Sequence, residues 1–229
     1  MQTVLTPEHK TGIFIQELKN RFLCEVEIDG ESTVCYVPSS CHLSNFLDLK
    51  GKSVLLAPTQ SKNARTQFAL FAIPYKKNYI LLNTSMANRA VADSIKGRRF
   101  SFLGRRGTIY TEHYVGGYKS DIYIQDTNTI IEVKSVLSTE KCALFPTVFS
   151  ERALKQLEKL RDLLSLGYRV HYSVISLNPY VSSIYFVSDV QFTPLLKSCI
   201  DLGMTISAFS CRIDDNRVYI DKRLQIILP

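Results

Sequence analysis

The chain has 229 residues, of which 45% are hydrophobic and 21% are charged. This composition excludes a disordered chain and allows one large domain or two small ones with real cores. No apolar run reaches the roughly 18 residues that a membrane span needs, and the first residues lack the pattern of a secretory signal. We therefore expect a cytoplasmic protein that has no membrane partner, and the sequence leaves a homo-oligomer open.

The formal net charge of +7 favours a polyanionic partner. The cysteines form no CxxC pair and the four histidines are scattered, so neither a zinc site nor a disulfide framework is indicated. The six cysteines are Cys24, Cys35, Cys41, Cys142, Cys199 and Cys211, and we expect most of these cysteines to be reduced core residues.

The first part of the chain is rich in short strands and has no long helix. The predicted strands are 13–18, 21–28, 32–37, 53–57, 66–73 and 78–83, and Asp29-Gly30 is a hairpin turn between the second and third. This pattern predicts a small barrel with an OB-like closure, in a domain of residues 1–82. Such barrels bind single-stranded nucleic acid through aromatic and cationic side chains, although the two phenylalanines equally suit the core. The candidates are Phe14, Lys19, Arg21, Phe22 and Tyr36.

A second domain is predicted over residues 83–229, beginning with a helix at 83–97. Five cations follow with no acid among them, which suits contact with phosphate groups, although a solvated face is the plainer interpretation. They are Lys96, Arg98, Arg99, Arg105 and Arg106.

The stretch 120–136 predicts an antiparallel hairpin, because two β-branched runs flank turn formers at 126–128. If the turn centres on Asp126 and Thr127, Asp121 faces Glu132 across the two strands. Side chains alternate along a strand, so Lys134 shares that face, while Ile122, Ile124, Ile131 and Val133 point to the other.

Two facing carboxylates repel each other unless one is protonated or a cation lies between them, and hard oxygens suit Mg²⁺ or Mn²⁺. A neighbouring ammonium can orient a water molecule or meet developing negative charge. The set Asp121, Glu132 and Lys134 therefore predicts a nuclease site. The alternative is a strand-end aspartate beside a solvated ion pair.

Around this hairpin the sequence predicts a mixed α/β sheet flanked by helices. A strand at 108–115 carries Glu112, and Ser150 caps a helix that ends at Gly167. From the start of this helix, Glu151 or Gln156 can approach a metal or a phosphate. Further strands are predicted at 168–177, 182–187, 204–213 and 217–227, with a helix at 193–203.

Six blocks along the chain resemble the sugar fermentation stimulation protein A (SfsA) family. They are RFLCEV (21–26), LNTSMANRA (82–90), SDIYI (120–124), IIEVKSV (130–136), LFPTVFSERALKQL (144–157) and GMTISAF (203–209). The resemblance implies an N-terminal OB-like domain, a C-terminal PD-(D/E)XK nuclease-like domain and DNA binding without marked sequence preference. It also implies a link to sugar (maltose) metabolism.

The nuclease residues of the family carry over onto Asp121, Glu132 and Lys134, and its helix block onto Glu151 and Arg152. Two positions depart from the family pattern. Thr147 stands where the family often has Asp, and 38–41 reads Pro-Ser-Ser-Cys where the family has a Pro-Asn-Thr-Gly-like turn.

Two hypotheses follow. In the first, the protein is a DNA nuclease in which Asp121, Glu132 and the Val133 carbonyl hold Mg²⁺ or Mn²⁺, with Glu112, Glu151 and Arg152 in support. In the second, it is a catalytically silent, sequence-nonspecific DNA-binding regulator of sugar metabolism. In both, the candidates for DNA contact are Lys19, Arg21, Arg98, Arg99, Arg105 and Arg106.

Overall fold

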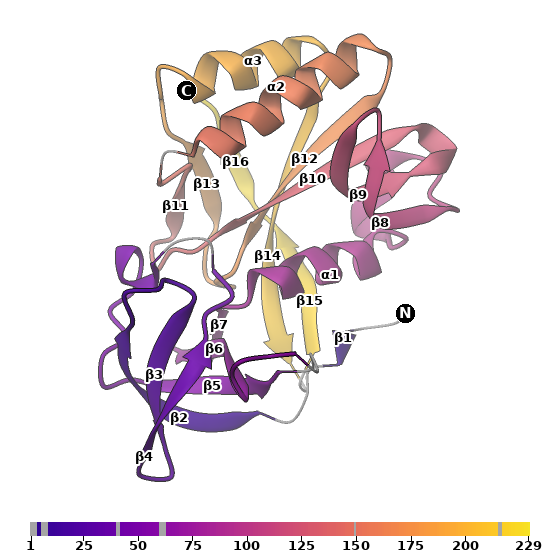
Figure 1. The fold of residues 1–229 in the computed structure, drawn as a ribbon. Coiled ribbons are helices and arrows are strands. Elements are labelled where there is room, and N and C mark those ends of the chain that lie inside the picture. The colour runs from indigo at the N-terminus through magenta and orange to yellow at the C-terminus, as the bar shows by residue number, and fades with distance from the viewer. Residues whose placement is uncertain (1–3, 6–8, 40–41, 60–62, 149, 215–216) are drawn as a thin grey trace.

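The computed structural model describes residues 4–5, 9–39, 42–59, 63–148, 150–214 and 217–229. The chain forms a β-barrel, followed by a mixed sheet that has helices on both faces (Figure 1). In Figure 1 the barrel is drawn in indigo and violet at the lower left, and the helices α2 and α3 cover the opposite end of the molecule.

The barrel is built from alternating strands whose inward side chains are apolar. Its strands are β2 (Lys10–Glu17), β3 (Leu23–Ile28), β4 (Glu31–Tyr36), β5 (Ser53–Pro58) and β6 (Phe68–Tyr75), with a short helix η1 (Leu43–Asn45) before β5. A parallel contact between β4 and β6, at Tyr36 and Ala69, closes these five strands. The predicted OB fold is confirmed. β7 (Asn78–Leu81) pairs with β6 and extends the sheet beyond the closure.

A seven-stranded sheet forms the second part of the chain, in the order β1-β15-β14-β12-β10-β9-β8. β10, β12 and β14 are parallel to one another, and β8, β9 and β10 follow one another as antiparallel neighbours, which includes the predicted hairpin. The strands are β1 (Val4–Leu5), β8 (Ile109–Val115), β9 (Tyr118–Ile124), β10 (Thr129–Val136), β12 (Arg169–Ser176), β14 (Thr205–Asp214) and β15 (Arg217–Arg223).

The helices begin where the sequence provides caps. α1 (Thr84–Ser94) is capped by Asn83, and α2 (Glu151–Ser165) by Ser150, whose Oγ accepts a hydrogen bond from Ala153 N at 3.2 Å. α3 (Phe192–Asp201) packs beside α2. The short helices η2 (Arg98–Leu103) and η3 (Gln125–Thr127) complete the helical segments.

The predicted single strand over residues 217–227 is wrong. The chain breaks at the buried Leu224, whose N–H donates to Ala208 O at 2.8 Å, and β16 (Gln225–Ile227) joins a separate small sheet. In that sheet β16 lies beside β13 (Ser183–Phe186), which pairs with β11 (Cys142–Phe145), a strand that the sequence analysis missed.

Within the described part of the chain, three buried clusters hold these layers together. The barrel core fills the barrel, and the helical core lies between α2, α3 and one face of the large sheet; it includes Leu157, Leu160, Tyr172 and Phe192. The shared core joins barrel residues to α1 and the other face of the large sheet. It includes Phe71, Leu81, Val91, Ile131, Ile175 and Phe209. The barrel and the sheet are therefore packed as one body.

In the part of the chain that the structure describes, the helices are too short or too polar to cross a membrane. The cytoplasmic location and a homo-oligomer stay predictions. Cys24, Cys35, Cys199 and Cys211 are buried, as expected, whereas Cys142 is exposed and Cys41 lies outside the described residues.

Candidate functional site

The predicted hairpin register is confirmed along the paired residues. Thr129 pairs with Ile124, Ile130 with Tyr123 and Ile131 with Ile122. The next step along this register places Asp121 opposite Glu132. Ile122, Ile124, Ile131 and Val133 all belong to the shared core, as the alternation of side chains predicts.

Asp121 is half-buried and is held by two donors from different elements. Its Oδ2 accepts a hydrogen bond from Val133 N at 2.8 Å, and its Oδ1 accepts one from Asn88 Nδ2 of α1 at 3.2 Å. Burial and the nearby Glu132 charge raise the pKa of Asp121 to about 6, although the bond from Val133 opposes this shift. A cation near Asp121 would therefore stabilise the charged form of its carboxyl group.

Glu132 is more deeply buried than the sequence suggests, with only 2% of its surface exposed. Its Oε2 accepts a hydrogen bond from the Tyr118 hydroxyl, and its Oε1 lies 2.6 Å from Lys134 Nζ. Lys134 Nζ also donates to Gln156 Oε1 of α2 at 2.6 Å. The ammonium group is fixed between β10 and α2, so the alternative of a solvated edge pair is wrong for Glu132 and Lys134.

The possible metal ligands at this site are few, and they are carboxylate oxygens. The described residues contain no group of three or more His, Cys, Asp or Glu side chains that could hold a metal ion. The Tyr172 hydroxyl is buried with no hydrogen-bond partner among the residues that the structure describes, and the charges of Glu132 and Asp121 add to the burial that raises its pKa. Two carboxylates and their waters suit Mg²⁺, which usually keeps several waters.

The predicted supporting residues do not converge on these carboxylates. Glu112 is exposed and forms an ion pair with Lys119, although its charge contributes slightly to the raised pKa of Asp121. Glu151 and Arg152 are exposed in the first turn of α2, and among the described residues neither bonds to Asp121, Glu132 or Lys134.

Sequence reasoning missed Asn88 and Tyr118 as partners of the site. Asn88 is a polar residue among small apolar ones on α1, which was the available signal, but only the packing of α1 on the sheet brings it to Asp121. Tyr118 follows the turn Gly116-Gly117, and nothing in its sequence surroundings marks it as a partner of Glu132.

The predicted basic cluster divides into exposed and structural residues. Arg98 and Arg99 are exposed on η2, and Arg105 is 85% exposed beside Asp126, with 3.3 Å between Nε and Oδ1. Arg106 is instead half-buried, and its Nη1 donates to the Phe100 carbonyl. We therefore exclude Arg106 from the predicted DNA contacts, because its guanidinium holds the η2 loop.

The barrel candidates also divide. Phe14 is buried in the barrel core, whereas Phe22 and Tyr36 are exposed on the outer face, so a core position for Phe22 is wrong. Lys19 and Arg21 are exposed, and the Arg21 guanidinium lies 4.9 Å from the centre of the Phe22 ring. An aromatic and cationic surface therefore does exist on the barrel.

Comparison with known proteins agrees with this architecture. The family model for the sugar fermentation stimulation protein RE domain matches residues 85–217, and the model for the SfsA N-terminal OB domain matches residues 18–82. The boundary placed between residues 82 and 83 stays a prediction.

Similar relatives cover almost the whole chain. A sugar fermentation stimulation protein homolog of Caldanaerobacter subterraneus subsp. tengcongensis is 33% identical, over 95% of this chain and 96% of the relative. A homolog from Ruminiclostridium cellulolyticum is 27% identical, over 96% and 97%. The solved structure of Pyrococcus furiosus SfsA in complex with Ca²⁺ has the same fold, with a TM-score of 0.85 at 21% identity and coverage of 99% of both chains. This chain belongs to the SfsA family.

Proposed function

We propose that the protein binds DNA without marked sequence preference and hydrolyses its phosphodiester bonds at a divalent-metal site. One observation carries the proposal: Asp121, Glu132 and Lys134 meet at the junction of β9, β10 and α2, with Glu132 buried and Asp121 half-buried. Buried carboxylates beside a fixed ammonium are costly to maintain for stability alone. They suit a reaction in which negative charge develops on a phosphate.

The residues fit a bound Mg²⁺ or Mn²⁺. Asp121 and Glu132 would hold the ion, and the Val133 carbonyl would join them, because a residue in a strand directs its N–H and C=O to the same side and the Val133 N–H already faces Asp121. The Pyrococcus furiosus relative was solved with Ca²⁺, another oxygen-seeking divalent ion. Such an ion lowers the pKa of bound water and polarises a phosphoryl oxygen.

The surrounding side chains orient the reacting groups. Asn88 and the Val133 N–H fix Asp121, while Tyr118 fixes Glu132. Lys134, held by Glu132 and Gln156, directs its remaining proton toward a water or a phosphate oxygen. A water oxygen then forms a bond to phosphorus and loses a proton to solvent, while the bond to the leaving oxygen breaks and that oxygen takes a proton from solvent. The ammonium stabilises the negative charge that develops on the phosphate.

A specific observation favours the second candidate, a silent DNA-binding regulator. The Asp121 and Glu132 oxygens already have protein partners, one of which is the cation Lys134. A site satisfied in this way can be a structural ion-pair network that never turns over.

Cleavage of DNA separates the two candidates. With Mg²⁺ or Mn²⁺, the wild type should cleave single-stranded, duplex or branched DNA. Lys134→Gln keeps a donor for Glu132 but removes the charge, and we expect it to lower the rate by about 10² to 10³ while DNA binding persists. The matched control Lys159→Gln changes an exposed lysine of α2 and should retain the rate. Cleavage by wild type no faster than by Asp121→Asn would leave the silent regulator as the function.

DNA binding itself is tested by its salt dependence. The logarithm of the affinity should fall linearly with the logarithm of the salt concentration, because bound cations replace counterions of the phosphates. Arg98→Ala, Arg99→Ala and Arg105→Ala together should flatten this slope by up to about 3 units, close to one for each lost phosphate contact. Arg106→Ala should lower the melting temperature instead. An unchanged slope in the triple variant would remove these arginines from the interface.

A further inference from the structure

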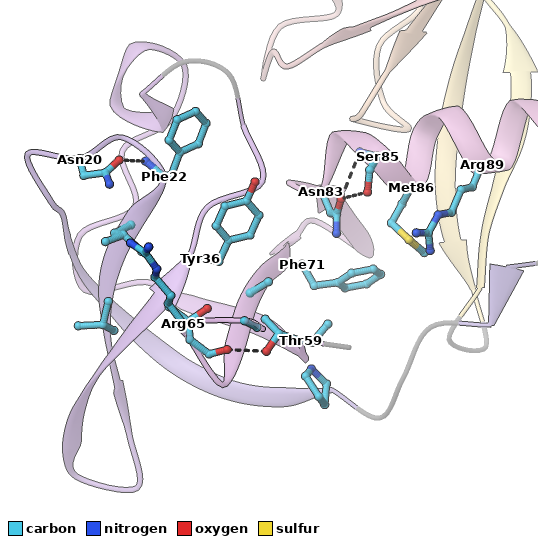
Figure 2. A pocket seen from close by; sticks show the side chains of 17 residues that line it. Asn20, Phe22, Tyr36, Thr59, Arg65, Phe71, Asn83, Ser85, Met86 and Arg89 are labelled. Atoms are coloured by element: carbon cyan, nitrogen blue, oxygen red, sulfur yellow. Dashed lines mark hydrogen bonds between the residues drawn. The ribbon is translucent and has the colours of Figure 1, made fainter. Parts of the chain in front are cut away.

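A pocket of about 580 Å³ lies between the barrel and the N-terminal part of α1, away from the carboxylates. Figure 2 shows Phe22 and Tyr36 on the barrel side and Asn83, Met86 and Arg89 on the α1 side. We call this cavity the barrel pocket. Its volume is in the range of sites for small molecules and nucleotide-sized groups.

The barrel side of the pocket presents exposed aromatic rings. Phe22 and Tyr36 are 38% and 40% exposed, and their rings are nearly parallel, with centroids 6.5 Å apart and an angle of 17° between the planes. Arg21 lies over Phe22 from outside the pocket lining. Exposed rings of this kind lose little entropy on binding and stack on any flat ligand that offers its face.

The charge of the pocket selects for an anion. Arg65 and Arg89 contribute to its lining, whereas the described lining residues include no Asp or Glu. Both arginines are exposed, so their guanidinium groups are free to meet phosphate oxygens at modest desolvation cost. Asn20, Asn83 and Ser85 add polar groups. A flat ring joined to a phosphate satisfies both the aromatic and the cationic parts.

α1 connects the barrel pocket to the carboxylate site. Ser85, Met86 and Arg89 line the pocket, and Asn88, the neighbour of Arg89, donates to Asp121. Asn88 and Arg89 are consecutive residues with Cα atoms about 3.8 Å apart, so one turn of α1 sends side chains to both sites, in directions about 100° apart. A DNA strand with one nucleotide in the pocket can extend along α1 toward Asp121, whereas a free nucleotide would occupy the pocket alone.

We propose that the barrel pocket holds an unpaired nucleotide of a DNA strand whose backbone runs along α1 to Asp121 and Glu132. The inference deepens the proposed function and rests on it, since it makes single-stranded DNA the preferred substrate. Bases in a duplex offer only their edges in the grooves, whereas stacking on Phe22 and Tyr36 requires an exposed base face.

The chain has no tryptophan, so Tyr36→Trp places a single fluorescent reporter at the pocket. A single-stranded oligo-dT of 12 nucleotides, chosen at roughly the site size of one OB fold, should quench its emission to saturation. The matching duplex should cause little quenching at the same concentration. Absence of quenching by the single strand would overturn the proposal, and so would saturation by dTMP at lower concentration than by the strand.

Affinity for the labelled single strand is then measured by fluorescence anisotropy. Tyr36→Ala should bind about 5- to 100-fold more weakly, in line with the loss of one stacked base, whereas Tyr36→Phe should keep wild-type affinity. The control Tyr185→Ala removes a similarly exposed tyrosine of β13 outside the pocket and should have no effect. Equal affinity of Tyr36→Ala and wild type would overturn the proposal.

The outcome is independent of turnover. Quenching by the single strand without any cleavage supports nucleotide binding in the barrel pocket and rules out the proposed phosphodiesterase activity. Cleavage of duplex DNA without quenching by the single strand supports the phosphodiesterase and overturns the pocket.

Discussion

At the scale of single residues, the Asp121 carboxyl stands in an environment that favours its protonated form. Its pKa is raised to about 6, first by burial and then by the charge of Glu132. The folded protein therefore binds this proton more tightly than the unfolded chain, whose Asp pKa is about 3.9. Stability falls as pH rises from about 4 to 6, and the cost above that window is on the order of 3 kcal/mol.

Replacement of Asp121 by Asn should remove this cost. In the presence of a chelator, we expect Asp121→Asn to melt at a higher temperature than wild type at pH 8, with the difference vanishing near pH 5 as Asp121 becomes protonated in the wild type. As a control, Asp48→Asn replaces an exposed carboxylate and should change the melting temperature little at either pH. A melting temperature of Asp121→Asn below that of wild type at pH 8 would contradict the environment described for this carboxyl.

The placement of Asp121 beside Glu132 could be predicted from sequence, and the hydrogen-bond partners of the two carboxylates could not. Alternation along two strands and the turn between them place Asp121 beside Glu132, because both are local properties. Asn88 reaches Asp121 only through the packing of a helix on a sheet, and Gln156 reaches Lys134 in the same way. Such contacts between distant segments leave no periodic signal in the chain.

At the scale of secondary structure elements, the β8–β9 hairpin contacts α2 through its turn. Gly116 has φ +56°, and a Cβ at this position would lie 2.4 Å from Cδ2 of Leu163, a buried residue of α2. The neighbouring Gly117 has φ +73° with open space around it. The two glycines therefore separate the cost of backbone strain from the cost of crowding.

Gly117→Ala should destabilise the protein by about 1 to 2 kcal/mol, the cost of a left-handed conformation for a residue with a Cβ. Gly116→Ala should cost that amount plus roughly 1 to 3 kcal/mol, because Leu163 must move within a packed core. Denaturation with urea measures both. Equal losses in the two variants would show that α2 accommodates the hairpin without strain.

Secondary structure elements were predicted well where packing on one sheet sets the pattern of buried and exposed residues. The barrel strands alternate between core and solvent, and the start of α2 follows from its cap, Ser150. The division of β15 from β16 was missed because residues 217–227 contain no Gly or Pro to mark a break, and only the existence of a second sheet separates the two strands at Leu224.

At the scale of the whole molecule, the shared core makes the barrel and the large sheet depend on each other. Phe71 of the barrel and Leu81 of β7 pack in the same cluster as Phe209 of β14, and Leu81 N donates to Leu177 O at 3.0 Å. Two parts joined through a common apolar cluster should unfold together rather than in sequence.

Phe209→Leu tests this coupling. In a Tyr36→Trp background, the tryptophan reports on the barrel, while far-ultraviolet circular dichroism reports on the whole chain. We expect one coincident transition, shifted equally for both probes by roughly 1 to 2 kcal/mol from lost apolar burial. The control Phe102→Leu replaces a ring that is 42% exposed and should shift the unfolding transition less. An unchanged barrel transition would mean that the two parts are independent.

The shared core also has a consequence for synthesis on the ribosome. The barrel strands end at Leu81, but β14 begins only at Thr205, so the barrel can close while the surface formed by Phe71, Ala72 and Leu81 still lacks its partner. At about 5 to 20 residues per second, β14 follows the barrel after roughly 6 to 25 seconds. During that interval the nascent barrel displays an apolar face of the kind that chaperones bind, and the pace of translation sets how long it stays uncovered.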